Sequence, residues 1–311
     1  MPAFLTHLLA ANDSYNQLSL PDKDILSYNY SSYLWGSLGP DLFYFHNFLS
    51  GNSPLFEYGN TMHQYKPQEL LTAMGQYVAA RRGSAEYSTL VAYHAGFMSH
   101  YHLDSTAHPY IYSQSELYAG LSPDRVRGGS HHRIEADISS TMYRLKTGQS
   151  VHTFAPKQRL PHNRDMDMAI ALLFRQVLQD VYGIMVPPEP IVDAFQDTLN
   201  AQVVIHDPTG FLFKAGASLV DIFRGRESTP FASHICQDNV TYDVLNQSHR
   251  EWFRCDLPQV SSHESFPSLF DLAVTATSDD IAEILRLTHT GEAFAPPYTL
   301  LFDEGAPPGS R

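Results

Sequence analysis

Histidine stands out in this chain because it is the commonest metal ligand and acid–base group in proteins. The 311 residues include 16 histidines, and eight of them lie between His46 and His132. Within this stretch His100, Asp104 and His108 follow one another at intervals of four residues. Residues four apart on a helix lie about 40° apart around its axis, so these side chains form one narrow stripe. Two imidazoles and a carboxylate on one helix face suit a zinc ion.

A second pair of this kind follows further along the chain. His131 and Glu135 are four residues apart, and His132, three residues before Glu135, could reach the same ion. Asp137 would face the other side of the helix. Two helices that each offer such a pair resemble the way helical bundles build sites for several metals. A single histidine–carboxylate pair at this spacing is more often a hydrogen bond in a core or on a surface than a metal site. The spacing alone therefore leaves metal binding and a structural hydrogen bond both open.

Long helices must hold these side chains. Hydrophobic periodicity, with Pro and Gly residues that mark helix ends, predicts several such helices. Helical phase turns His94 and His102 away from the stripe. Pro109 is expected to stop the helix that carries the stripe. Scarce strand patterns indicate an all-α protein, with long loops at 13–60 and 149–165. The expected helices cover residues 1–12, 67–82, 85–108, 131–146, 166–183, 191–207, 211–224 and 265–288.

The overall composition restricts the classes of partner. A formal net charge of −13 argues against a broad basic face for nucleic acid and against electrostatic docking on anionic lipid. From the sequence we expect no basic or amphipathic membrane-docking segment. At 43% hydrophobic residues the chain can bury a proper core, and we expect one domain over 1–300 followed by a tail over 301–311.

The start of the chain and its cysteines give further expectations. The first residues contain no basic n-region, and no run of 18 apolar residues occurs, so we expect no signal peptide, no transmembrane segment and a cytoplasmic location. Cys236 and Cys255 are too few for a cysteine zinc site and are expected to be free buried thiols. The scattered histidines from His152 to His289, His234 among them, are expected to be structural or exposed.

Short pieces of sequence that carry these residues occur in the same order as similar pieces in a known protein family. They are THLLAA, GSLGPDLFYF, TMH, GFMSHYHLDSTAHPY and HHRIEAD, with LNQSHREWF further on. Together they resemble the zinc-dependent phospholipase C family, including the related N-terminal domain of glycosylphosphatidylinositol-specific phospholipase D. The resemblance implies a phospholipase C/P1 nuclease-like helical bundle around two to three zinc ions.

The resemblance also implies which side chains hold each ion. The ligands of the first zinc would be Asp41, His63, His100 and Asp104. Those of the second would be His108, His131 and Glu135. Those of the third would be His7, Asp104 as a bridge, and the amino terminus, which could be Pro2 after removal of Met1. His108 lies four residues after Asp104, as in the phospholipase D branch, whereas secreted bacterial phospholipases C place this histidine six residues after it. C-type and D-type cleavage therefore both stay open.

These residues predict a zinc-dependent phosphodiesterase that hydrolyses a phospholipid or a related small phosphodiester with metal-activated water. Asp41, on a turn, is the candidate general base, or else a turn-capping aspartate. Phe43, Tyr44 and Phe45 could wall a substrate cleft, or else belong to the core. The alternatives are a single-strand nuclease of the P1 type, which the negative charge disfavours, and a non-catalytic, metal-stabilised helical binding domain. The sequence does not fix the head group or the oligomeric state.

Overall fold

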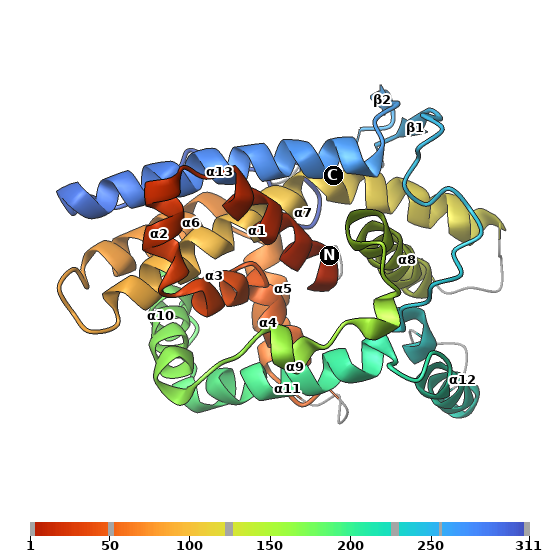
Figure 1. The fold of residues 1–311 in the computed structure, drawn as a ribbon, viewed down its shortest axis with the longest axis horizontal. Helices are drawn as coiled ribbons and strands as arrows, with labels where there is room; N and C mark the ends of the chain where they lie inside the picture. The colour runs from red at the N-terminus through yellow and green to blue at the C-terminus, as the bar shows by residue number, and fades with distance from the viewer. Residues whose placement is uncertain (1–3, 49–52, 122–126, 225–229, 255–256, 308–311) are drawn as a thin grey trace.

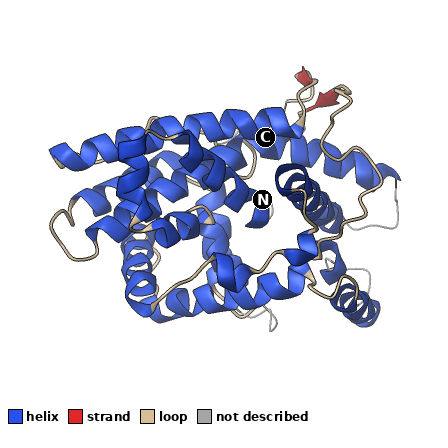
Figure 2. Ribbon diagram, in the orientation of Figure 1, coloured by secondary structure: helices blue, strands red, loops and turns tan. Residues whose placement is uncertain are grey.

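The structure of the chain is a computed structural model that describes residues 4–48, 53–121, 127–224, 230–254 and 257–307. It confirms an all-α protein with one short two-stranded hairpin among these residues (Figure 2). The first half contains α1 (Phe4–Gln17), α2 (Leu20–Ser27), α3 (Tyr30–Gly36), η1 (Gly39–Asp41), α4 (Leu42–Phe45), α5 (Leu55–Gln64), α6 (Pro67–Ala79), α7 (Tyr87–Leu121) and α8 (Arg127–Thr147). The second half contains η2 (Val151–Thr153), α9 (Pro156–Arg159), α10 (Arg164–Tyr182), α11 (Pro188–His206), α12 (Leu212–Arg224), η3 (Phe231–His234), β1 (Trp252–Phe253), β2 (Ser261–Ser262) and α13 (Phe266–Thr290).

The 35-residue helix α7 is the central element, and α13, α3, α8 and α1 pack against it (Figure 1). The prediction that Pro109 ends this helix is wrong, because α7 continues to Leu121. The residues that follow the proline are held by packing and hydrogen bonding: Tyr110 is buried and its hydroxyl donates to Val244 O at 2.7 Å, and Ile111 lies in the core. Burial of these side chains outweighs the single backbone hydrogen bond that a proline removes.

Helix α3 crosses α7 at a point where both helices carry glycine. A Cβ built on Gly96 would lie 1.9 Å from the carbonyl oxygen of Tyr33, and one on Gly36 would lie 2.1 Å from that of Tyr93. The two backbones therefore touch, and no side chain fits between them. This contact sets how close the segment that leads to Asp41 comes to α7.

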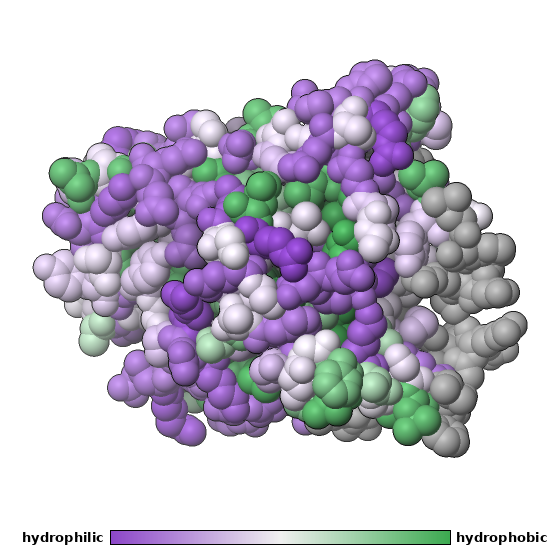
Figure 3. Space-filling model, turned by 45° about the vertical axis from the view of Figure 1, so that its right-hand side comes forward, coloured by the Kyte–Doolittle hydropathy of each residue, from purple (hydrophilic) through white to green (hydrophobic). Residues whose placement is uncertain are grey.

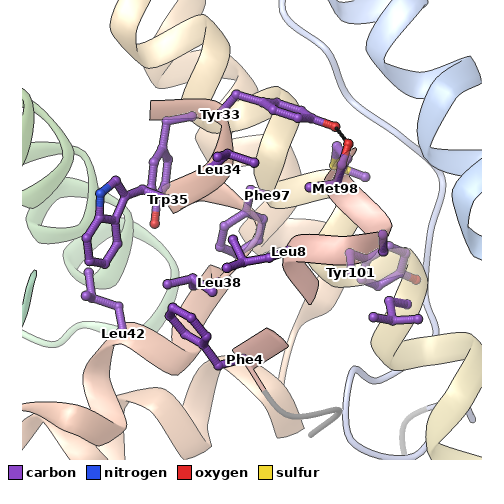
Figure 4. Close-up of a cluster of buried hydrophobic side chains, with 14 of the residues drawn as sticks. Phe4, Leu8, Tyr33, Leu34, Trp35, Leu38, Leu42, Phe97, Met98 and Tyr101 are labelled. Carbon is purple, nitrogen blue, oxygen red and sulfur yellow. Dashed lines mark hydrogen bonds between the residues drawn. The ribbon is translucent and has the colours of Figure 1, made fainter. Parts of the chain in front are cut away.

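The hydrophobic core around α1, α3 and α7 contains many aromatic side chains and forms one cluster. Figure 4 shows Phe4 and Leu8 of α1 beside Leu38, Leu42 and Phe97, all of them buried. Helix α1 is tied to α3 by the hydroxyl of Tyr33, which donates to Ala11 O at 2.8 Å. The first helix is therefore fixed to α3, and both helices pack against α7.

The expectation of loops over residues 13–60 is wrong for most of the segment, which contains α2, α3, η1, α4 and α5. Local signals do support these short helices. Ser19 caps α2 by accepting a hydrogen bond from the backbone of Asp22, and a proline stands in the first turn. Tyr33 and Trp35 are completely buried, so tertiary packing fixes helices that are too short to be stable alone.

Residues 301–307, expected to belong to a tail, pack on α7 instead. Phe302 is completely buried, and a Cβ on Gly305 would lie 2.1 Å from Ser105 O. The glycine has a positive φ of 57°, which lets the chain run this close to the helix. Composition suggested a frayed end, but one buried phenylalanine anchors the segment; residues 308–311 lie outside the described residues.

Cys236 is a buried free thiol, as expected, whereas Cys255 lies outside the described residues. Within the described part of the chain, no helix combines the length and the apolar character needed to cross a membrane.

The glycine crossing gives the first testable prediction. Gly96→Ala should lower the free energy of unfolding by about 3 kcal/mol, because the new methyl group overlaps Tyr33 O and the helices must separate. Gly120→Ala, in the same helix, is the control: its Cβ would meet no described atom within 4 Å, so stability should rise by about 0.5–1 kcal/mol. Urea unfolding measures both, and equal effects of the two changes would contradict the close contact.

Candidate metal centre

Three chain segments bring carboxylates and imidazoles to one buried point on α7. His100 and Asp104 lie on α7, His63 lies near the end of α5, and Asp41 is the last residue of η1. Asp41 can approach because Gly39, with φ of 52°, passes directly over the His100 ring, where a Cβ would lie 2.4 Å from Cγ. All four ligand-type side chains are buried.

The distances among these four side chains match the edges of a zinc coordination shell. The atoms Asp41 Oδ1, His63 Nε2, His100 Nε2 and Asp104 Oδ2 are separated by 3.1, 3.2, 3.3, 3.6 and 3.8 Å in the five pairs that include a histidine. Four ligand atoms placed tetrahedrally at about 2.0–2.1 Å from a zinc ion are about 3.3 Å apart. Asp41 Oδ1 and both oxygens of Asp104 find no hydrogen-bond partner among the described residues, although imidazoles surround them. The donor atoms thus face a common point rather than one another.

Backbone carbonyls orient the histidine rings. His63 Nδ1 lies 2.8 Å from Gly59 O, His100 Nδ1 lies 3.3 Å from Ser37 O, and His108 Nδ1 lies 2.8 Å from Phe302 O. Because a carbonyl oxygen only accepts, Nδ1 carries the proton in each ring. When the ring is neutral, the lone pair is therefore left on Nε2, which is the atom that faces the carboxylates, as in metal-binding histidines.

His7 of α1 approaches the same carboxylates from the other side. Its Nε2 lies 3.3 Å from Asp104 Oδ1 and 4.0 Å from Asp41 Oδ2, and its ring stacks on His100 with centroids 4.2 Å apart. Neither ring nitrogen of His7 has a hydrogen-bond partner among the described residues. Asp104 thus has one oxygen towards His7 and the other towards His63 and His100, the arrangement of a bridging ligand. The amino terminus expected to complete a third site lies outside the described residues.

A second donor group lies one turn further along α7. His108 Nε2 is 3.9 Å from Glu135 Oε1, and His131 Nε2 is 2.9 Å from the same oxygen. His132 Nδ1 lies 3.4 Å from Glu135 Oε2. One ligand-type atom from each of His108, His131 and Glu135 lies within 4.8 Å of the others, so the three side chains could hold an ion.

Side chains that helical phase turned away from the stripes do face elsewhere. His102 Nε2 lies 2.7 Å from Asp280 Oδ2 on α13, and the His94 ring packs against Phe294. Asp137 is held by Arg133 Nη2 at 2.5 Å, away from Glu135.

The protonation states of the buried histidines favour metal binding at most of these positions. Burial lowers the pKa of His108 to about 4 and also lowers the pKa of His100 and of His131, so these rings are neutral at pH 7. Burial alone would raise the pKa of Asp104, but electrostatic interactions with His100 and His108 and hydrogen bonds to His100 and His7 outweigh burial and hold this pKa well below its usual range. Neutral imidazoles and an ionised carboxylate are the forms that bind a metal.

A cavity of about 600 Å³ borders both donor groups. From the expected site residues, Asp41, His131 and Glu135 line it, together with Tyr44 and Phe45. Phe43 does not: it is completely buried and packs edge-on against Phe174 at 4.9 Å, so the expectation that it walls the cleft is wrong. It lies on the core side of a short helix whose next residues face the cavity.

Several residues that line the cavity were not among the expected site residues, although Tyr112 follows His108 by four residues and helical phase could have found it. They are Phe4, His46, Phe48, Phe56, Tyr112, Phe231, His234 and Asp303. Neither spacing nor helical phase relates η3 or the last segment of the chain to α7. His234 was expected to be structural or exposed, yet its ring stacks on His132 with centroids 4.0 Å apart and borders the cavity.

Buried histidine and carboxylate groups at zinc-like spacing on long helices define the class of protein: a helical protein with a candidate multi-metal centre. A family model described as zinc-dependent phospholipase C matches residues 6–181. Because the match covers more than half of the chain, the chain belongs to the zinc-dependent phospholipase C family, and the matched region contains every expected ligand from His7 to Glu135. The searches of curated proteins and of solved structures returned no match.

Metal content provides the second prediction. Protein purified without chelators should contain at least one zinc per chain, and His100→Gln should lose at least one ion relative to the wild type. His102→Gln is the matched control, since it changes a buried histidine of the same helix that faces Asp280 instead, and it should retain the wild-type content. Elemental analysis of the folded proteins decides, and equal zinc in both variants would contradict the assignment of His100.

The pH dependence of zinc binding provides the third prediction. Burial opposes a charge on His63, but the carboxylates of Asp303 and Asp41 outweigh it and raise the pKa of this ring to about 9. Zinc must displace that proton, so apparent affinity should rise with pH up to about 9, by on the order of tenfold per unit. Titration calorimetry at pH 7.5 in buffers of different ionisation enthalpy should detect about one proton released per chain. Zinc binding without proton release would contradict this state of His63.

Proposed function

We propose that this chain is a zinc-dependent phosphodiesterase that hydrolyses a phospholipid or a closely related phosphodiester. The observation that carries the proposal is the position of the two donor groups. One contains Asp41, the other contains His131 and Glu135, and all three residues line one cavity. A phosphodiester bound there would meet both groups at once.

Zinc bound to these groups would lower the pKa of a coordinated water to about 7 and neutralise charge on the phosphate. The chain's own contribution begins with Asp41. Its carboxylate ends η1 rather than projecting from the α7 stripe, and unlike Asp104 it borders the cavity. It is therefore placed to orient the attacking water and to accept its proton. Burial raises the pKa of Asp41, which makes it a better base than an exposed aspartate.

The cavity wall supports an amphiphilic substrate. Its lining combines Asp41, His131 and Glu135 of the two donor groups with aromatic side chains, which are Tyr44, Phe45, Phe48, Phe56 and Phe231. No lysine or arginine is among its lining residues in the described part of the chain. A nuclease groove needs such cations along the phosphate backbone, so the lining favours a lipid or small ester over a polynucleotide.

The same proposal includes the domain organisation. We assign residues 1–300 to one phospholipase C-like helical domain and extend it through the packed segment 301–307. His108 donates to Phe302 O in that segment, so the candidate centre depends on it.

Replacement of Asp41 provides the fourth prediction. Asp41→Asn should reduce hydrolysis of a short-chain phosphatidylcholine by about 10²-fold or more, because an amide cannot accept the proton of the attacking water. Asp193→Asn, on the exposed surface of α11, should have wild-type activity. The zinc content of both variants separates loss of the base from loss of metal.

The same assay tests the alternatives. Release of phosphocholine indicates C-type cleavage, and release of choline indicates D-type cleavage. Full activity of Asp41→Asn would remove its proposed role, and hydrolysis of single-stranded DNA in place of the phospholipid would favour the nuclease. Absence of turnover on any phosphodiester despite full zinc loading would favour a binding domain.

A further inference from the structure

Helix α12 and the residue before it present an apolar outer face to solvent. Phe211, Leu212, Phe213, Leu219 and Val220 are between 36% and 64% exposed. The remaining exposed residues between them are alanine, glycine and serine. Figure 3 shows hydrophobic residues gathered along the lower edge of the molecule, on the side where Figure 1 places α12. A contiguous apolar patch of this kind on a protein surface marks an interaction site.

The charged side chains within residues 211–221 are directed away from this face. The ammonium group of Lys214 bonds the side-chain oxygen of Gln237. The carboxylate of Asp221 accepts hydrogen bonds from the backbone N–H groups of Phe231 at 2.6 Å and Ala232 at 2.8 Å. Both charged residues, Lys214 and Asp221, are half-buried. A chain with a net charge of −13 thus carries a helical surface without an exposed charge over these residues.

The apolar face adjoins the candidate active site. Asp221 fixes η3, and Phe231 and His234 of η3 line the cavity beside the two donor groups. The inner side of α12 therefore supports the cavity wall, and its outer side is the adjoining surface. A partner molecule or surface bound to the outer side of α12 would therefore lie next to the cavity.

We propose that the outer face of α12 docks the protein on a zwitterionic phospholipid surface, with the helix in the plane of the interface. This inference rests on the proposed function, because a lipid-hydrolysing site needs its substrate delivered from an aggregate. A helix that is apolar on one side inserts that side at the boundary of head groups and acyl chains. The lack of exposed cations over residues 211–221 and the net charge of −13 match an uncharged surface and oppose an anionic one.

Flotation with large unilamellar vesicles of phosphatidylcholine tests the docking directly. The wild type should bind, and its binding should be unchanged between about 0.05 and 0.5 M salt, because the attraction is apolar rather than electrostatic. Replacing Leu219 and Val220 together by aspartate should reduce the partition coefficient at least ~tenfold. Leu272→Asp on α13, away from α12 in Figure 1, is the matched control with a similarly exposed leucine and should bind as the wild type does.

A second assay separates this inference from the proposed function. With a short-chain phosphatidylcholine kept monomeric, the double variant should hydrolyse substrate as the wild type does, while its activity on vesicles falls with its binding. Equal vesicle binding by the wild type and the double variant would overturn the docking. So would binding that requires anionic lipid, or a wild-type dimer that becomes monomeric in the double variant without either form binding vesicles. If the wild type hydrolyses no phosphodiester yet loses vesicle binding only through α12, the proposed function fails and the docking stands.

Discussion

The burial of the Asp104 carboxylate is the constraint on which the rest of the structure depends. A buried carboxylate costs several kcal/mol unless positive charge or hydrogen bonds offset the loss of water. Among the described residues, no lysine or arginine forms an ion pair with Asp104 or Asp41. Their ion-pair partners are His7, His63 and His100, and backbone carbonyls hold the last two rings with Nε2 facing inward. A divalent cation at the common point would satisfy all of these atoms together.

Helix α7 holds imidazoles around the buried carboxylate because its two faces differ in composition and contacts. One face carries the ligand-type residues His100, Asp104 and His108. The other face joins α13, where Asp280 receives His102 at 2.7 Å and the hydroxyl of Tyr298 at 2.9 Å. Because the same rigid helix is anchored on one side, the imidazoles on the other side are held in place before any ion binds. Preorganisation of this kind reduces the entropy lost when a metal is bound.

Sequence reasoning succeeded where the controlling geometry is local. The period of a helix placed His100, Asp104 and His108 together and excluded His102 and Asp137, since neighbours four residues apart depend only on helix geometry. The convergence of Asp41 and His63 on this stripe followed from family resemblance, because it depends on a close helix crossing at Gly36 and Gly96. No periodicity describes a contact of that kind.

The misses have physical causes as well. Pro109 was expected to end α7, but burial of the following residues kept the helix intact. Phe231, His234 and Asp303 come from segments remote in sequence, and only the tertiary fold brings them to the cavity. The apolar face of α12 was present in the sequence as a helix at 211–224, yet its exposure depends on what the rest of the chain leaves uncovered.

The central claim is that the buried carboxylates and histidines exist to hold metal. Anomalous diffraction at the zinc absorption edge, from crystals of protein purified without chelators, tests it most directly. The account predicts a strong peak between Asp41, His63, His100 and Asp104, and a second among His108, His131 and Glu135. Well-ordered side chains without an anomalous peak, joined instead by direct hydrogen bonds or by water, would contradict it.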